Sequence, residues 1–383
     1  MHSLEAIDMK GSESVLQSSL PVIDTGERLT TEFELFSEGD ELYAAMARSI
    51  RGATRRVFLA SYILAADEVG NLLLNELMRQ SRRGLDVRVH VDALGSSVGL
   101  TRRHRRMLRA AGVRLKRFHR WSWRQPMRYN RRDHRKLLVV DGQTAYLGGF
   151  NIHREGSQRF YGPTRWRDEH VCFTGALAAE VEFFFDAFWH GHLDWSPPRQ
   201  TKNDSWITPN TTRHCRIQLR CILENELNQA SERIWLVTPY FVPDRGMRRQ
   251  LVLAARRGVD VRILTTEKTD SAPAQWAARA FYGELIANGV RVFEYVPRLL
   301  HAKILLVDND WGSIGTANFD YRSLFINYEI ILISENGALN RQLRSDYLRD
   351  LQDANEIVDT DWRRRGLLGY LQDRLGLLLR KWL

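Results

Sequence analysis

The fold of this chain is decided by a stretch that occurs twice, first as Asp133-His134-Arg135-Lys136-Leu137-Leu138-Val139-Val140-Asp141. The second copy begins at His301 and continues through Lys303 to Asp308. In both copies one residue separates the histidine from the lysine, and four apolar residues separate the lysine from the aspartate. An apolar run with charged ends is typical of a buried strand. The histidine and the lysine, two residues apart on such a strand, project from the same face.

A glycine and an asparagine follow both copies at the same distance. Gly148 and Gly315 come after six further residues, and Asn151 and Asn318 lie three positions beyond them. Glycine lets the backbone approach a ligand closely. A single His-x-Lys would indicate little more than a surface strand, but two complete copies in one chain predict a functional site.

The elements around the two copies repeat as well. The periodicity predicts a helix over 40–50, a strand over 56–63, a helix over 71–82 and a strand over 87–91. Residues 257–263 then repeat residues 83–89 closely. The chain is therefore interpreted as an internal duplication of an α/β domain, with two halves related by a pseudo-twofold axis. Each half is predicted to be a mixed, mostly parallel sheet flanked by helices.

The duplication suggests four segments. Residues 1–30 are expected to be a flexible leader, 31–200 the first domain, 205–360 the second, and 361–383 a basic, leucine-rich tail. Prolines and polar residues gather at 196–210, which places the boundary between the domains there.

The pair of motifs resembles the signature of the phospholipase D superfamily, and the resemblance covers the chain from about Glu32 to about Asp359. It implies that both motifs build one active site between two phospholipase D-like domains. The segments after the motifs, Trp166-Arg167-Asp168 and the series from Asn318 to Ser323, resemble those of bacterial cardiolipin synthases. We expect the short type that lacks N-terminal membrane-spanning helices.

Two histidines suit a two-step exchange of a phosphodiester. One imidazole attacks phosphorus, and the other protonates the departing alkoxide and later deprotonates the incoming alcohol or water. The motifs are too symmetric to tell the two apart, and only the analogy with related phospholipases assigns the attack to His134 and the proton transfers to His301. Lys136 and Lys303 would stabilise the charge of the phosphate oxygens, with Asn151 and Asn318 as additional donors that bind substrate.

Four acidic residues complete the predicted site. Asp168 and Glu329 follow the motifs at the positions where the family places a carboxylate that orients a histidine, although a surface ion pair is the alternative for each. We group both with the substrate-binding residues. Asp141 and Asp308 belong to the catalytic motifs, but we interpret them as anchors of the strand ends.

Composition narrows the function classes. The chain has 383 residues, a formal net charge of +10 and 44% hydrophobic residues, which favours a globular protein with anionic partners. No signal peptide and no apolar run long enough for a membrane-spanning helix is recognisable. The three cysteines show no metal-ligand spacing, and the lysines supply the positive charge that a metal would otherwise give. We therefore expect no metal and no cofactor, and we disfavour a metal-dependent hydrolase.

Membrane contact would come from two basic segments. Residues 102–136 hold fifteen Lys and Arg against the single acid Asp133, with Trp121 and Trp123 among them. Such a segment suits an anionic lipid interface first, a solvated basic face second and nucleic acid third. The tail either lies in the membrane interface as an amphipathic helix or packs onto the second domain.

The sequence as a whole predicts a phosphatidyltransferase at the surface of the bacterial inner membrane. It would make cardiolipin from phosphatidylglycerol and a second phospholipid through a phosphatidyl-histidine intermediate, releasing glycerol. A phospholipase D-type hydrolase and a metal-independent phosphodiesterase or nuclease are the alternatives, and nucleic acid is the less expected partner. Trp276, Phe281 and Tyr282 either line a channel for the lipid or belong to the core. The oligomeric state is left open.

Overall fold

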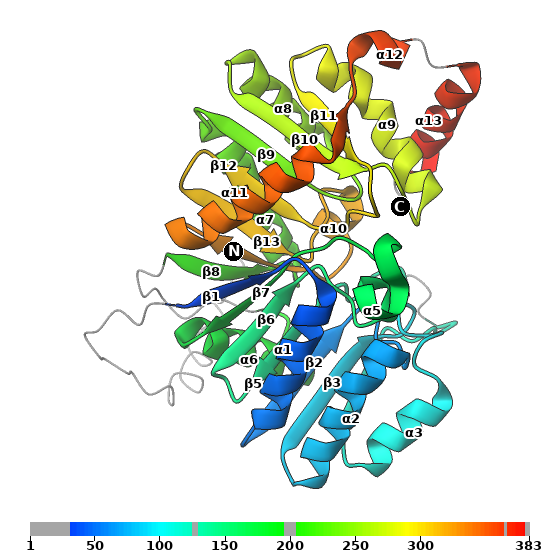
Figure 1. Ribbon diagram of the computed structural model, residues 1–383, viewed down its shortest axis with the longest axis vertical. Helices are drawn as coiled ribbons and strands as arrows, with labels where there is room; N and C mark the ends of the chain where they lie inside the picture. The colour runs from blue at the N-terminus through cyan, green and yellow to red at the C-terminus, as the bar shows by residue number, and fades with distance from the viewer. Residues whose placement is uncertain (1–30, 125–128, 195–203, 364–365, 380–383) are drawn as a thin grey trace, which may run out of the picture. The chain divides into compact units, whose positions relative to one another are not determined.

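The computed structural model describes residues 31–124, 129–194, 204–363 and 366–379. The expected leader, 1–30, lies outside the described residues. The first half forms a seven-stranded sheet in the order β1-β7-β6-β5-β2-β3-β4 (Figure 1). Its strands are β1 (Phe33–Phe36), β2 (Arg56–Ser61), β3 (Asp86–Asp92), β4 (Arg114–Phe118), β5 (Leu137–Val140), β6 (Thr144–Gly148) and β7 (His170–Thr174).

The second half repeats this sheet. Its order, β8-β14-β13-β12-β9-β10-β11-β15, places each strand as in the first sheet and adds β15 at the edge. The strands are β8 (Ser205–Pro209), β9 (Arg233–Val237), β10 (Asp260–Thr266), β11 (Arg291–Tyr295), β12 (Ile304–Val307), β13 (Trp311–Gly315), β14 (Ile330–Ser334) and β15 (Ala354–Glu356). The predicted α/β duplication is thus confirmed at the level of topology.

The sheets are mixed, as predicted, but the expectation that they are mostly parallel is wrong. Only β2–β3, β3–β4, β9–β10 and β10–β11 pair in parallel among the described strands, and the other neighbours are antiparallel. The reason lies in the motif itself. Strand β5 turns at Asp141-Gly142 directly into β6, and so short a connection can only join antiparallel strands.

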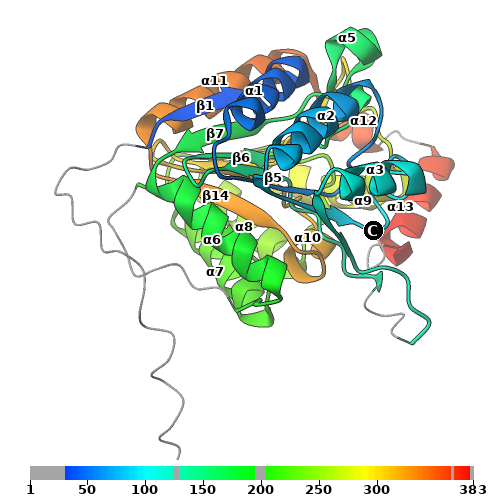
Figure 2. The same cartoon turned by 90° about the horizontal axis from the view of Figure 1, so that it is seen from below.

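Helices cover both faces of the sheets. Figure 2 shows α1, α2 and α11 on one side of the strands and α6, α7 and α8 on the other. The helices of the first half are α1 (Gly39–Gly52), α2 (Glu68–Arg82), α3 (Arg102–Ala110), α5 (Gln158–Tyr161) and α6 (Ala176–His190), with the 3₁₀ turns η1 (Arg154–Gly156) and η2 (Gly162–Thr164). Those of the second half are α7 (Arg213–Gln229), α8 (Arg245–Arg256), α9 (Ala272–Ile286), α10 (Tyr321–Phe325), α11 (Gly337–Gln352), α12 (Asp359–Arg363) and α13 (Leu367–Leu379).

The two sheets share a hydrophobic core. One cluster of buried residues contains Phe173 and Phe184 from the first half together with Trp235, Ile314 and Tyr347 from the second. One helix of each half also packs against a strand of the other half: α6 contacts β8, and α11 contacts β1. The predicted boundary near residue 200 falls largely outside the described residues, and the chain has joined the second sheet by Ser205. Residues 31–383 therefore form one compact unit.

The motif aspartates anchor the ends of β5 and β12. Asp141 has a φ of 56°, in the left-handed region, and its carboxylate accepts hydrogen bonds from the amides of Arg55 and Arg56 at 2.8 Å and from the amide and hydroxyl of Thr54. Asp308 has a φ of 50° and binds the amides of residues 231–233 in the same way. Although burial opposes ionisation, the backbone donors hold the pKa of Asp141 below its ordinary value.

We expect Asp141→Ala to destabilise the protein by about 2–3 kcal/mol, because it leaves several backbone donors without an acceptor and places alanine at a positive φ. Asp141→Asn should cost less, since asparagine tolerates the left-handed region and can still accept. The midpoint of urea unfolding measures both. An unchanged midpoint combined with lost activity would assign Asp141 to the chemistry instead.

Candidate active site

Backbone hydrogen bonds join the two halves where the motifs begin. The amide of His134 donates to the carbonyl of Tyr328 at 2.9 Å, and the amide of Tyr328 donates to the carbonyl of Arg132 at 2.8 Å. The second motif repeats this arrangement with the first half, since the amide of His301 donates to the carbonyl of Arg167 at 2.6 Å. The backbone of each motif histidine is therefore hydrogen-bonded to the backbone of the opposite half, as in a pair of β-strands.

The carboxylate that orients each histidine also comes from the opposite half, an arrangement that we call the exchange of carboxylates. Nδ1 of His134 lies 3.0 Å from Oε2 of Glu329, and Nδ1 of His301 lies 2.5 Å from Oδ2 of Asp168. An ionised carboxylate can only accept, so a proton on each Nδ1 would satisfy these contacts, and Nζ of Lys303 also lies 2.8 Å from Nδ1 of His301. Each Nε2 is then the atom left with a lone pair for chemistry. Asp168 is buried, yet after the opposing effect of burial Lys303 and His301 hold its pKa below the ordinary value.

The two halves make room for their carboxylates differently. A Cβ atom at Gly149 would lie 2.0 Å from Oδ1 of Asp168, so only glycine fits there. The equivalent position in the second half is Thr316, whose hydroxyl donates to Oε2 of Glu329 at 2.6 Å. Thr316 was not among the predicted site residues. The sequence could have indicated its role, because the first motif has Gly-Phe-Asn where the second has Thr-Ala-Asn.

Both motif lysines are buried next to the histidines. Nζ of Lys136 donates to the carbonyl of His134 at 2.8 Å, and Nζ of Lys303 donates to the carbonyl of His301. Burial lowers the pKa of Lys136 to about 7, against the opposing effect of Glu329. Burial likewise lowers the pKa of Lys303 to about 8, against Asp168. Burial and Lys303 together lower the pKa of His301 to about 4, so its ring is neutral near pH 7 in the empty site.

Because the pKa values of both lysines are lowered, we expect activity to decline at alkaline pH. Each ammonium is protonated below its pKa and neutral above it, so the free protein loses positive charge as the pH rises through about 7 and 8. We expect kcat/KM to fall over that range. Lys136→Arg keeps its charge at every working pH and should move the alkaline limit toward the pKa of Lys303, even if the rate itself is lower. A pH profile of kcat/KM for both proteins checks this, and an unmoved limit in the variant contradicts it.

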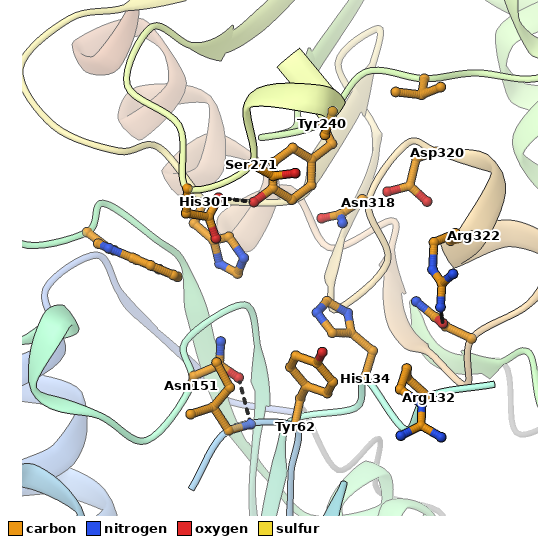
Figure 3. A pocket seen from close by; sticks show the side chains of 16 residues that line it. Tyr62, Arg132, His134, Asn151, Tyr240, Ser271, His301, Asn318, Asp320 and Arg322 are labelled. Atoms are coloured by element: carbon orange, nitrogen blue, oxygen red, sulfur yellow. Dashed lines mark hydrogen bonds between the residues drawn. The ribbon is translucent and has the colours of Figure 1, made fainter. Parts of the chain in front are cut away.

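The two histidines open into one pocket between the halves. Its volume is about 240 Å³, and Figure 3 shows both rings at the edge of one open space with Asn151 and Asn318 beside it. The described lining residues are Tyr62, Ile63, Arg132, His134, Asn151, Trp166, Tyr240, Val242, Asp270, Ser271, Ala274, His301, Asn318, Asp320, Arg322 and Asn327. The structure thus brings His134, His301, Asn151 and Asn318 together as predicted from the motifs.

Other predicted site residues lie outside this lining. Asp168 and Glu329 contact Nδ1 on the far side of each imidazole, so they position the histidines rather than bind substrate directly. Asp141 and Asp308 lie at the opposite end of their strands from the lysines, about 15 Å away by strand length, which supports their interpretation as anchors of the strand ends. Phe281 and Tyr282 belong to the core of the second half, and Trp276 lines a separate cavity. None of these three lines the active-site pocket.

Several lining residues were not predicted as site residues. The ring of Trp166 lies 5.1 Å from that of His301, and Tyr62 meets His134 edge-on at 4.9 Å. The hydroxyl of Tyr240 donates a hydrogen bond to the carboxylate of Asp270. Arg132 and Arg322 occupy the end of the pocket near His134. Their positions beside the motifs were visible in the sequence, but their direction into the pocket depends on the meeting of the two halves. Within the described residues, no group of three or more His, Cys, Asp or Glu side chains is arranged to hold a metal.

Comparison with known proteins agrees with this geometry. A family model described as "Cardiolipin synthase, PLD-like domain" matches residues 46–189 and 223–351, which contain one motif each. The chain belongs to this family. It is 33% identical to cardiolipin synthase A of Pseudomonas fluorescens over 91% of this chain and 74% of that protein. It is 30% identical to a cardiolipin synthase of a Geobacillus species over 88% of this chain and 70% of the relative.

Solved structures show the same fold at lower identity. The phosphatidylserine synthase of Haemophilus influenzae superposes with a TM-score of 0.69 at 16% identity, covering 91% of this chain and 92% of that one. A polyphosphate kinase of Porphyromonas gingivalis superposes with a TM-score of 0.61 at 16% identity, covering 86% of this chain and 49% of the kinase. The predicted phospholipase D-like fold of this family member is confirmed.

Proposed function

We propose that this member of the family is a phosphatidyltransferase that makes cardiolipin from phosphatidylglycerol and a second phospholipid. The observation that carries the proposal is the exchange of carboxylates between the halves, which leaves two oriented imidazoles facing one pocket. One nucleophile and one proton carrier are what a two-step exchange at phosphorus requires. The relatives named as cardiolipin synthases supply the substrate class.

In the first step, Nε2 of His134 attacks the phosphorus of phosphatidylglycerol. The bond from phosphorus to the glycerol oxygen breaks, and His301 gives that oxygen its proton, so that free glycerol leaves. Because burial and Lys303 lower the pKa of His301 to about 4 in the empty site, the negative phosphodiester must raise this pKa on binding. Substrate binding therefore converts His301 to the protonated form that acts as the acid.

In the second step, the neutral His301 takes a proton from a hydroxyl group of the acceptor lipid. The oxygen attacks phosphorus, the bond to His134 breaks, and cardiolipin forms. Lys136 and Lys303 would stabilise the charge on the phosphate oxygens during both displacements, and the amide groups of Asn151 and Asn318 would add donors. Water in place of the acceptor would give phosphatidic acid, so exclusion of water favours transfer.

We also propose that the protein acts at the surface of the bacterial inner membrane, where its substrates reside. Among the described residues, no helix is long and apolar enough to cross a bilayer. The net charge of +10 favours contact with anionic lipids.

Product analysis tests the reaction. Purified protein is incubated with phosphatidylglycerol vesicles in the presence of a chelator, with a His134→Ala/His301→Ala double variant as the blank. Cardiolipin and glycerol in equal amounts support the proposal. Phosphatidic acid without cardiolipin would make the protein a hydrolase. Cleavage of DNA without any lipid product would make it a nuclease.

A further inference from the structure

Large apolar side chains are exposed on two elements that belong to different halves of the protein. On α13, Leu371, Leu375 and Leu378 are 63%, 46% and 78% exposed. Their spacing of four and three residues aligns them in one stripe along the helix. In the segment after β4, Trp121 and Trp123 are 66% and 77% exposed. Grouped exposure of this kind indicates an interaction surface.

The leucine stripe is close to the active-site pocket. A Cβ atom at Gly376 would lie 2.3 Å from the amide nitrogen of Ala277, so α13 is seated directly on the first turns of α9. Ser271 and Ala274, at the start of that helix, line the pocket. One helix packing distance, about 10 Å between the axes, therefore separates α13 from the helix whose start lines the pocket. The predicted packing of the tail onto the second half is found, and the leucines point away from that contact.

Trp121 is connected to the same pocket from the first half. The ring of Trp121 meets that of Tyr129 edge-on at 5.1 Å, and the guanidinium of Arg132 lies 4.3 Å over the ring of Tyr129. Arg132 itself lines the pocket. Trp121 is thus linked to the pocket through Tyr129 and Arg132, and the stripe is linked to it through α9.

Positive charge accompanies these apolar groups. Helix α3 carries Arg102, Arg103, Arg105, Arg106 and Arg109, and the sequence from 102 to 132 contains no acid. Figures 1 and 2 both place α3 and α13 on the side of the molecule away from α11. We call the stripe of α13, the two tryptophans and α3 the basic apolar face.

We propose that the basic apolar face is the surface on which the protein rests on an anionic lipid bilayer, with the active-site pocket held at the lipid headgroups. The proposal rests on the proposed function, because it places the pocket where a lipid substrate would enter. A surface that carries arginines together with exposed leucines and tryptophans matches a bilayer with negative headgroups above an apolar interior. A nucleic acid would pair with the arginines but would leave the leucines of α13 in water.

Vesicle binding by the full chain tests the face. The probe is co-sedimentation with vesicles of equal parts phosphatidylglycerol and phosphatidylcholine, at low and at high salt. We expect Leu371→Glu/Leu375→Glu/Leu378→Glu to weaken binding by roughly 100-fold, and Trp121→Ala/Trp123→Ala to weaken it by about tenfold. Leu348→Glu is the matched control, because Leu348 is 40% exposed on α11, on the other side of the molecule. The control should bind as the unchanged protein does.

Activity separates docking from catalysis. Both face variants should turn over short-chain phosphatidylglycerol, dispersed as monomers, at the unchanged rate while losing turnover of vesicles. Unchanged vesicle binding by the leucine variant, or an equal loss in Leu348→Glu, overturns the proposal. So does a face variant that loses binding to duplex DNA but keeps binding to vesicles. If the unchanged protein transfers phosphatidyl groups on neither substrate, the proposed function fails, but the binding comparison still decides the face. Circular dichroism verifies folding, and the tryptophan pair provides an answer independent of α13.

Discussion

His134→Ala and His301→Ala are each expected to lower phosphatidyl transfer by roughly 10⁴-fold or more, the range seen when one member of a catalytic unit is removed. Because both rings face one pocket, neither half can compensate for the other. The double variant should therefore retain about the same residual rate as each single variant. Rates of cardiolipin formation under single-turnover conditions measure all three.

The intermediate identifies the role of each histidine. With phosphatidylglycerol that carries a labelled phosphorus, we expect the label on His134 in the His301→Ala protein and no label in the His134→Ala protein, as mapped by mass spectrometry. The reverse pattern would exchange the two roles and leave the shared site intact. About half of the rate remaining in each single variant, with full loss only in the double variant, would indicate two separate sites.

Asp168→Asn and Glu329→Gln are expected to lower the rate by roughly 10²–10⁴-fold, because an amide can present a donor to Nδ1 and select the wrong tautomer. Each change should act on the histidine of the opposite half. Nitrogen NMR of labelled histidines is the direct readout, since Asp168→Asn should alter the titration of His301 and leave that of His134 in place. A change confined to the histidine of the same half would contradict the exchange of carboxylates between the halves.

Local patterns predicted much of this protein. The helix over 40–50 and the strand over 56–63 lie within two residues of α1 and β2, because their apolar spacing reflects the side that faces the core. The two motifs predicted the histidines and asparagines of the pocket. Asp141 and Asp308 were interpreted as anchors, and their hydrogen bonds to the backbone agree with that interpretation rather than with a catalytic role.

What the sequence could not predict depends on contacts between residues far apart in the chain. Nothing near Asp168 indicates that its partner is His301, 133 residues further on. The number of antiparallel pairs was missed because strand–helix–strand alternation suggested parallel strands, whereas the turn at Asp141-Gly142 decides the pairing of the motif strand. Trp166 and Arg322 gain their positions only when the two halves meet.

The exchange of carboxylates between the halves has a consequence for synthesis of the protein on the ribosome. Asp168 emerges long before His301, and His134 emerges 195 residues before Glu329. A nascent chain that ends before the second motif therefore holds an unpaired carboxylate and an unoriented imidazole, and it is chemically inert. Contacts of such long range form late in folding. A reactive histidine thus becomes available only once almost the entire chain has been made.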